Sequence, residues 1–165
     1  MSRSLLLVRH AKQSGLAVRD HERPLTDQGR EAAHRVGQRL HEDGPLLDRA
    51  ICSTALRCRE TWQALAAAIG SPPPVDFEPT LYNASAQDLL EAIAGVDETV
   101  GTLLVLAHNP GISVLGLMLA GTRDEDRNTL SAGFSTGAMA CFAIEGAWST
   151  ISPARTRLLR FDPTS

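Results

Sequence analysis

Three segments of the sequence share one pattern: a short apolar run, a polar turn, and then a helix with an apolar stripe. The apolar runs cover residues 5–8, 49–52 and 102–107. Continuous apolar runs of this length are typical of strands that are buried on both faces of a sheet. Strands that alternate with helices predict an α/β fold with three layers, α/β/α, around a mostly parallel central sheet.

The expected helices begin with capping residues and end at glycine or proline. Thr, Ser and Asn side chains accept hydrogen bonds from the free N–H groups of a first helical turn, and glycine commonly ends a helix. The expected caps are Thr26 for helix 27–42, Ser53 or Thr54 for a helix that runs to residue 69, and Asn109, with Pro110 in the first turn, for a helix that stops at Gly121. A weaker helix is expected at 86–94, and two strands at 137–144 and 156–161, with Glu145 and Gly146 in a turn.

The length of 165 residues suits one ordinary domain with its own hydrophobic core. Hydrophobic residues make up 43% and charged residues 21% of the chain, which is a normal globular mixture. The three prolines at 72–74 form a stiff loop, because apolar segments continue on both sides at similar spacing. We therefore expect a single domain over residues 1–165.

Charge and cysteine content limit the classes of partner and compartment. A net charge of −3, from 16 basic and 19 acidic side chains, gives no support for nucleic-acid or membrane-surface binding. Cys52, Cys58 and Cys141 have no C-x-x-C spacing and sit among apolar neighbours, which favours reduced packing thiols. With no signal-peptide pattern and no long apolar stretch, we expect a soluble cytoplasmic protein of undetermined oligomeric state.

Polar and basic residues follow each of the three expected strands. Ligands of parallel sheets bind outside the carboxyl ends of the strands, so residues far apart in the sequence meet there in one crevice. Guanidinium groups and free backbone N–H groups at helix N-termini match a phosphate, and none of the residues concerned is acidic. Arg57 lies in a helical first turn, where a cation costs ~0.3–1 kcal/mol unless an anion offsets it. The six residues are Arg9, His10, Ser53, Arg57, His108 and Asn109.

Other chemistries fit this set of residues less well. Two arginines repel a divalent metal ion, and the set has no carboxylate to serve as a third ligand, so we expect no metal and no other cofactor. A serine nucleophile is disfavoured because the G-x-S-x-G motif is missing. Cys58 lies close to the expected site, and a reactive thiol there is kept as an alternative.

Four motifs in order resemble the histidine phosphatase superfamily, whose fold is phosphoglycerate mutase-like. They are Leu7-Val8-Arg9-His10-Ala11-Lys12, Arg23-Pro24-Leu25-Thr26-Asp27-Gln28-Gly29, Ser53-Thr54-Ala55-Leu56-Arg57 with Thr61, and Ala107-His108-Asn109-Pro110. The Arg-His-Ala-Lys opening and the short chain resemble the SixA-like phosphohistidine phosphatase branch. The resemblance extends from Leu5 to about Phe161 and covers nearly the whole chain.

The resemblance implies a role for each matching residue. His10 is the expected nucleophile, which attacks as a neutral imidazole and forms a phosphohistidine intermediate. Arg9, Arg57 and His108 are expected to hold the phosphoryl oxygens, and the two arginines to lower the pKa of His10. Asn109, Lys12 and Arg23 are candidates for substrate binding, although local hydrogen bonds are an equal alternative for Arg23.

The sequence departs from the wider family at the proton donor. Most members carry a carboxylate where Asn83 stands here, and an amide is not a useful acid. Glu78 and Asp20 are possible substitutes. Without an acid the site should prefer phosphohistidine, whose imidazole can leave as a neutral group, over simple alkyl phosphates. A phosphorylated protein is therefore the expected partner, and a small-molecule phosphatase or mutase of the same fold and a non-catalytic phosphate-binding module are the alternatives.

Overall fold

The computed structural model describes residues 2–17 and 19–163. Their elements alternate along the chain as the apolar pattern predicts, with two antiparallel strands at the C-terminal end. The elements are β1 (Ser2–Arg9), α1 (Asp27–Asp43), β2 (Arg49–Ser53), α2 (Leu56–Ile69), β3 (Val75–Glu78), α3 (Ala86–Ala94), β4 (Thr102–Ala107), α4 (Gly111–Ala120), α5 (Asp124–Leu130), β5 (Met139–Glu145) and β6 (Thr156–Asp162), with short 3-10 helices at Asp20–Glu22, Pro79–Leu81, Trp148–Thr150 and Pro153–Arg155.

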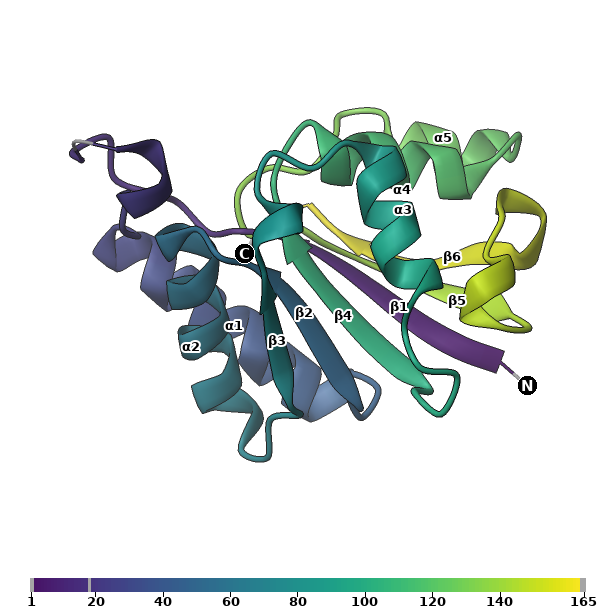
Figure 1. Cartoon of the computed structure of the whole chain (residues 1–165), viewed down its shortest axis with the longest axis horizontal. Coiled ribbons are helices and arrows are strands. Elements are labelled where there is room, and N and C mark those ends of the chain that lie inside the picture. The colour runs from purple at the N-terminus through teal and green to yellow at the C-terminus, as the bar shows by residue number, and fades with distance from the viewer. Residues whose placement is uncertain (1, 18, 164–165) are drawn as a thin grey trace.

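The six strands form one sheet in the order β3-β2-β4-β1-β5-β6. β1, β2, β3 and β4 pair in parallel, whereas β5 and β6 run antiparallel along one edge. Figure 1 shows α1 and α2 on one face of the sheet and α3, α4 and α5 on the other. The predicted three-layer α/β/α fold with a mostly parallel sheet is thus confirmed. Because β4 lies between β1 and β2, the turns that follow these three strands are neighbours at the carboxyl ends of the parallel strands.

The apolar run of β1 packs against helices on both faces, because successive side chains of a strand point in opposite directions. Leu5 and Leu7 belong to the core under α3 and α4, while Leu6 and Val8 belong to the core under α1 and α2. All four side chains are fully buried. At ~1.5–3 kcal/mol for each fully buried apolar side chain, this strand alone is a substantial anchor of the fold.

The start of α1 is joined to the turn after β1. Thr26 caps the helix, and its hydroxyl accepts a hydrogen bond from the Gly29 N–H, as the sequence predicts. The Thr26 N–H in turn donates to the Lys12 carbonyl at 2.9 Å. A Cβ on Gly29 would lie 2.3 Å from that carbonyl oxygen, so only glycine permits this approach.

The other two predicted caps are wrong. Ser53 ends β2, and Ala55 stands at the N-cap of α2 without a side-chain hydrogen bond. Pro110 stands at the N-cap of α4, while the Asn109 amide donates to the Phe134 carbonyl. In both cases the polar side chain makes a tertiary hydrogen bond and does not cap the helix.

Three further differences concern short or polar segments. β3 and α5 were not expected, because V-D-F-E is short and only half apolar and α5 is almost wholly polar. β5 begins at Met139, two residues later than expected. Of the turn expected at Glu145 and Gly146, Glu145 is the last residue of β5, and Gly146 begins a longer connection that holds two 3-10 helices before β6.

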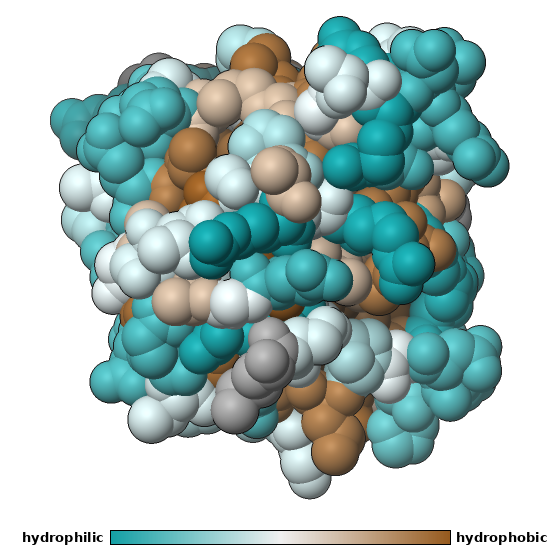
Figure 2. Space-filling model, turned by 90° about the vertical axis from the view of Figure 1, so that its right-hand side faces the viewer, coloured by the Kyte–Doolittle hydropathy of each residue, from teal (hydrophilic) through white to brown (hydrophobic). Residues whose placement is uncertain are grey.

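The face of the molecule in Figure 2 is largely polar, and apolar residues form separate patches on it. Among the described residues, no helix combines the length and the hydropathy that a bilayer crossing requires.

Candidate active site

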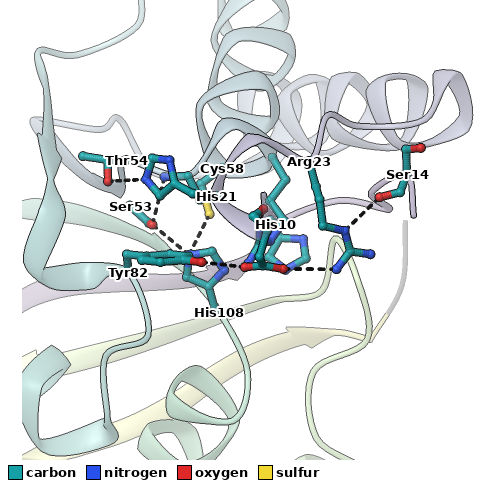
Figure 3. A network of polar contacts seen from close by, with 12 residues as sticks. His10, Ser14, His21, Arg23, Ser53, Thr54, Cys58, Tyr82 and His108 are labelled. Atoms are coloured by element: carbon teal, nitrogen blue, oxygen red, sulfur yellow. Dashed lines mark hydrogen bonds and ion pairs between the residues drawn. The ribbon is translucent and has the colours of Figure 1, made fainter. Parts of the chain in front are cut away.

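The turns after β1, β2 and β4 bring together Arg9, His10, Arg57 and His108, which we call the basic site. In the parallel register of β1 and β4, Arg9 lies beside Ala107, so His10 and His108 follow neighbouring strands. Their ring centroids lie 5.3 Å apart. Arg57 enters from the first turn of α2. Figure 3 shows the two histidines within one network of polar contacts. The rule that ligands bind at carboxyl strand ends thus predicted which of these residues lie together.

The basic site is mostly withdrawn from solvent. His10, Arg57 and His108 are only 3%, 6% and 6% exposed, respectively. Buried cationic and polar groups without partners are costly, and such groups in proteins are paired or hydrogen-bonded. A largely buried set of two guanidinium groups and two imidazoles is therefore suited to an anion.

The imidazole of His10 is held in one tautomer. Its Nδ1 lies 2.8 Å from the Ala11 carbonyl oxygen, and because a carbonyl can only accept, Nδ1 carries the hydrogen. Nε2 is left with its lone pair. Burial, and to a smaller extent His108, Arg57 and Arg9, lower the pKa of His10 to about 3, against the raising effect of the Ala11 carbonyl. The lowered pKa was predicted from the arginines, but burial is the larger cause.

His108 is also a neutral imidazole at pH 7. Burial and, secondly, Arg57 lower its pKa to about 4. Nε2 lies 2.7 Å from the Ser53 hydroxyl and 3.6 Å from the Cys58 sulfur. Nδ1 is buried and has no hydrogen-bond partner among the described residues. The side of His108 with Nε2 is thus anchored to β2 and α2.

The two arginines are held by backbone and carboxylate oxygens. Arg9 donates to the Phe134 carbonyl at 3.0 Å, and burial, followed by the charge of Arg57, lowers its pKa. Arg57 donates to the backbone carbonyl of Asp20 at 2.9 Å and to its carboxylate at 3.1 Å. These contacts restrict both guanidinium groups before any substrate binds, which lowers the entropy cost of binding.

Asp20 and Tyr82 complete the network. The Tyr82 hydroxyl donates to the Asp20 carboxylate at 2.6 Å, and Arg23 donates to it at 3.3 Å. The Tyr82 hydrogen bond, followed by the charge of Arg57, lowers the pKa of Asp20 to about 2, against the effect of burial. Asp20 is therefore ionised at neutral pH. Sequence reasoning overlooked Tyr82, whose ring centroid lies 5.7 Å from that of His108, because its neighbours carry no local signal for the site.

Not all of the other predicted residues reach the basic site. Glu78 ends β3 and lines a different cavity, together with Arg49 and Asp97. Lys12 is exposed. Its backbone carbonyl accepts hydrogen bonds from the N–H and the hydroxyl of Thr26.

Arg23 and Asn109 lie beside the basic site and form hydrogen bonds with residues outside it. Arg23 donates to the Ser14 carbonyl at 2.9 Å, which is a hydrogen bond of the kind that its alternative role predicts. Asn109 donates to the Phe134 carbonyl at 2.8 Å and accepts from the Ser113 hydroxyl at 2.5 Å. Asn83 has a positive φ of 57°, a backbone conformation in which Asn is enriched among non-glycine residues.

The alternative of a reactive Cys58 is not supported. Cys58 is fully buried, and burial raises the pKa of its thiol to about 12, so the nucleophilic thiolate is scarce at neutral pH. Cys52 and Cys141 are likewise free and buried. Within residues 2–17 and 19–163, no cluster of three or more His, Cys, Asp or Glu side chains is arranged to hold a metal ion.

Comparison with known proteins agrees with this geometry. An uncharacterized protein of Mycobacterium tuberculosis is 34% identical over 160 residues, which cover 93% of this chain and 98% of that relative. A solved structure assigned as the phosphohistidine phosphatase SixA of Nakamurella multipartitia matches with a TM-score of 0.86 and 33% identity, over 99% of this chain and 97% of that one. A phosphoglycerate mutase of Plasmodium falciparum shares the fold, with a TM-score of 0.65 and 16% identity over 99% and 92% of the two chains.

The family match contains the whole basic site. Residues 5–111 match the histidine phosphatase superfamily (branch 1), and this segment runs from β1 to the start of α4. The solved SixA structure extends the likeness to the remaining strands. The chain is therefore a member of branch 1 of the histidine phosphatase superfamily, with a SixA-like structure.

Proposed function

We propose that this chain is a metal-independent phosphatase that carries the phosphoryl group on His10 and removes it from phosphohistidine in another protein. The observation that carries the proposal is the state of His10: a neutral imidazole, hydrogen-bonded at Nδ1 to a backbone carbonyl, beside buried Arg57 and His108 and half-buried Arg9, which can hold an anion. A non-catalytic phosphate-binding site has no need of such a nucleophile.

The proposed reaction has two steps. In the first, the Nε2 lone pair of His10 attacks phosphorus, the bond to the leaving group breaks, and the leaving group takes the electron pair. In the second, water attacks the phosphohistidine, the P–N bond breaks, and His10 recovers its lone pair as inorganic phosphate departs. The proton that the water loses goes to the phosphate or to solvent.

Arg9, Arg57 and His108 would stabilise the phosphoryl oxygens during both transfers. Charge on these oxygens is spread through the transition state, and fixed donors stabilise it without reorganising. Losing one such donor typically costs ~10²–10³ in rate, or about 2.7–4 kcal/mol. Asp20 and the Phe134 carbonyl would keep the two guanidinium groups in place.

The substrate class follows from the leaving group. Asn83 replaces the usual carboxylate, and Asp20 is ionised at neutral pH, so neither supplies a proton readily. An imidazole can leave as a neutral group once its other nitrogen is protonated, and free imidazole titrates near ~6.5. An alkoxide is far more basic and needs an acid. The SixA structure that is 33% identical to this chain bears the name of a phosphohistidine phosphatase, which supports phosphohistidine as the substrate.

The first experiment removes the nucleophile. His10→Ala should abolish release of phosphate from a phosphohistidine peptide, while circular dichroism shows an intact fold. His34→Ala, an exposed position on α1, is the matched control and should retain activity. Near wild-type turnover by His10→Ala would eliminate the proposal. Wild-type turnover in the presence of a chelator should also persist, because no step uses a metal; its loss would favour a metal enzyme.

The second experiment tests the substrate class. The value of kcat/KM should be higher for phosphohistidine peptides and phosphoramidates than for phosphosugars and other alkyl phosphates. Asp20→Asn should lower kcat less than tenfold, because a true general acid contributes ~10²–10⁴. Equal efficiency on alkyl esters, or a large loss in Asp20→Asn confined to those esters, would identify a small-molecule phosphatase with a hidden acid.

A further inference from the structure

The two ring nitrogens of His108 have opposite surroundings. Nε2 faces the hydroxyl of Ser53 at 2.7 Å and the sulfur of Cys58 at 3.6 Å. Nδ1 is buried and has no hydrogen-bond partner among the described residues, although the ring centroids of His10 and Tyr82 lie 5.3 and 5.7 Å from that of His108. Figure 3 shows Ser53 and Cys58 on the same side of the His108 ring. A neutral imidazole carries one hydrogen, so these surroundings decide which nitrogen donates.

The hydrogen bonds of Ser53 favour a lone pair on Nε2. Ser53 is fully buried, and its oxygen accepts from the Ala55 N–H at 3.3 Å. If Nε2 carried the hydrogen, the Ser53 oxygen would accept twice, and among the described residues its own hydrogen would have only the Cys58 sulfur, a weak acceptor. If Nε2 holds the lone pair, the Ser53 hydroxyl donates to it at a short distance. Leaving the buried Ser53 hydroxyl with so weak an acceptor is costly, whereas the Nδ1–H of the second arrangement can donate to a bound anion, so the second arrangement is favoured.

The same accounting places the hydrogen of His108 on Nδ1. An Nδ1–H is the form that a phosphoryl oxygen can use, whereas a bare Nδ1 lone pair would repel it. The contrast with His10 is instructive, since its Nδ1–H is occupied by the Ala11 carbonyl and its Nε2 lone pair is free. His10 thus offers an electron pair and His108 a hydrogen. The difference arises because His10 is bonded to the Ala11 carbonyl and His108 to the Ser53 hydroxyl.

We propose that Ser53 is a positioning residue that holds His108 in its Nδ1–H tautomer, so that neutral His108 donates a hydrogen bond to the phosphoryl group. This inference rests on the proposed function for its catalytic meaning, but the tautomer itself is measurable without any activity. Cys58 would support the arrangement, because its thiol is protonated at neutral pH and can also donate toward Nε2.

The decisive readout is the tautomer. Nitrogen NMR of protein labelled with ¹⁵N-histidine distinguishes a protonated ring nitrogen from one with a lone pair, and His108→Ala assigns the signals. Wild-type His108 should show a protonated Nδ1 at pH 7, and Ser53→Ala should show a mixture of tautomers. Thr54→Ala is the matched control, because the neighbouring Thr54 hydroxyl bonds to His21 rather than to His108. A lone pair on Nδ1 in the wild type, or an unchanged tautomer in Ser53→Ala, would overturn the inference.

Kinetics then test whether Ser53 acts through His108. On an aryl phosphate, Ser53→Ala should lower kcat about 10- to 100-fold, less than complete loss of a donor, because part of the population keeps the productive tautomer. In a His108→Ala background, Ser53→Ala should cause little further loss, since the residue that it positions is gone. Fully additive losses would contradict the inference. An inactive wild type would contradict the proposed function, whereas the tautomer measured by NMR would not be affected.

Discussion

His10 and His108 are two buried imidazoles that remain neutral beside two arginines. Burial is the first cause of both lowered pKa values, about 3 for His10 and about 4 for His108. The nearby arginines act in the same direction, which is why the sequence alone predicted the sign correctly. A solvent-exposed histidine beside the same arginines would be screened by water and would change much less.

These lowered pKa values predict how the free energy of unfolding depends on pH. In the unfolded chain both histidines take up a proton near pH ~6.5, whereas the folded protein resists until about pH 4 for His108 and about pH 3 for His10. The unfolded state therefore binds more protons in this window, and stability falls as the pH drops from ~6.5 toward 4. His10→Asn should reduce this slope by up to about 1.4 kcal/mol per pH unit.

Urea unfolding at several pH values measures that slope. The wild type and His10→Asn should have parallel stability curves above pH ~8, where the histidine is neutral in both states. Parallel curves between pH 6 and 4 would show that His10 is accessible to protons in the folded protein.

At the level of elements, the loop after β1 is attached to the start of α1. In an open helical position, Gly→Ala would stabilise by roughly 0.5–1 kcal/mol. At Gly29, however, the new Cβ would lie 2.3 Å from the backbone oxygen of Lys12, which cannot rotate away. Overpacking of this kind costs ~1–3 kcal/mol, so the clash exceeds the gain in helix propensity.

Gly29→Ala should therefore destabilise the protein by about 1–3 kcal/mol and displace the loop that carries His10. Urea unfolding gives the first quantity, and a fall in kcat with circular dichroism unchanged gives the second. Gly15→Ala lies in the same loop with no atom within 4 Å of the new Cβ, and should change stability by less than about 0.5 kcal/mol. A Gly29→Ala protein as stable as the wild type would refute the role of this contact.

At the level of the whole molecule, the sheet joins groups that are distant in the chain into one anion site. Because β4 lies between β1 and β2, the residues that follow all three strands are neighbours at their carboxyl ends. The net charge of the chain is −3, so the attraction for an anion is local to the basic site and not a property of the surface as a whole.

Inorganic phosphate should consequently stabilise the folded state. At a concentration one hundred times its Kd, the gain is about 2.7 kcal/mol, or roughly 5–10 °C in Tm for a chain of this size. Differential scanning fluorimetry in phosphate, with chloride of equal ionic strength as the control, measures it. The double variant Arg9→Gln with Arg57→Gln should lose the shift. A shift of equal size in that variant would place the anion elsewhere.

The sequence by itself determined the layers, the parallel strands and the identity of the basic site. Apolar runs buried on both faces predict the parallel sheet, and the strand-end rule then groups Arg9, His10, Arg57 and His108. Both inferences use local periodicity and a general rule of topology, so no detailed coordinates are needed.

Only the tertiary structure decided which hydrogen bonds the polar side chains make. Ser53 and Asn109 look like helix caps in the sequence, yet they bond to His108 and to the Phe134 carbonyl. Tyr82 and Asp20 meet across 62 positions of sequence. A buried polar side chain forms hydrogen bonds with the polar groups that the fold brings near it. The identity of these partners depends on long-range packing, which local sequence patterns do not encode.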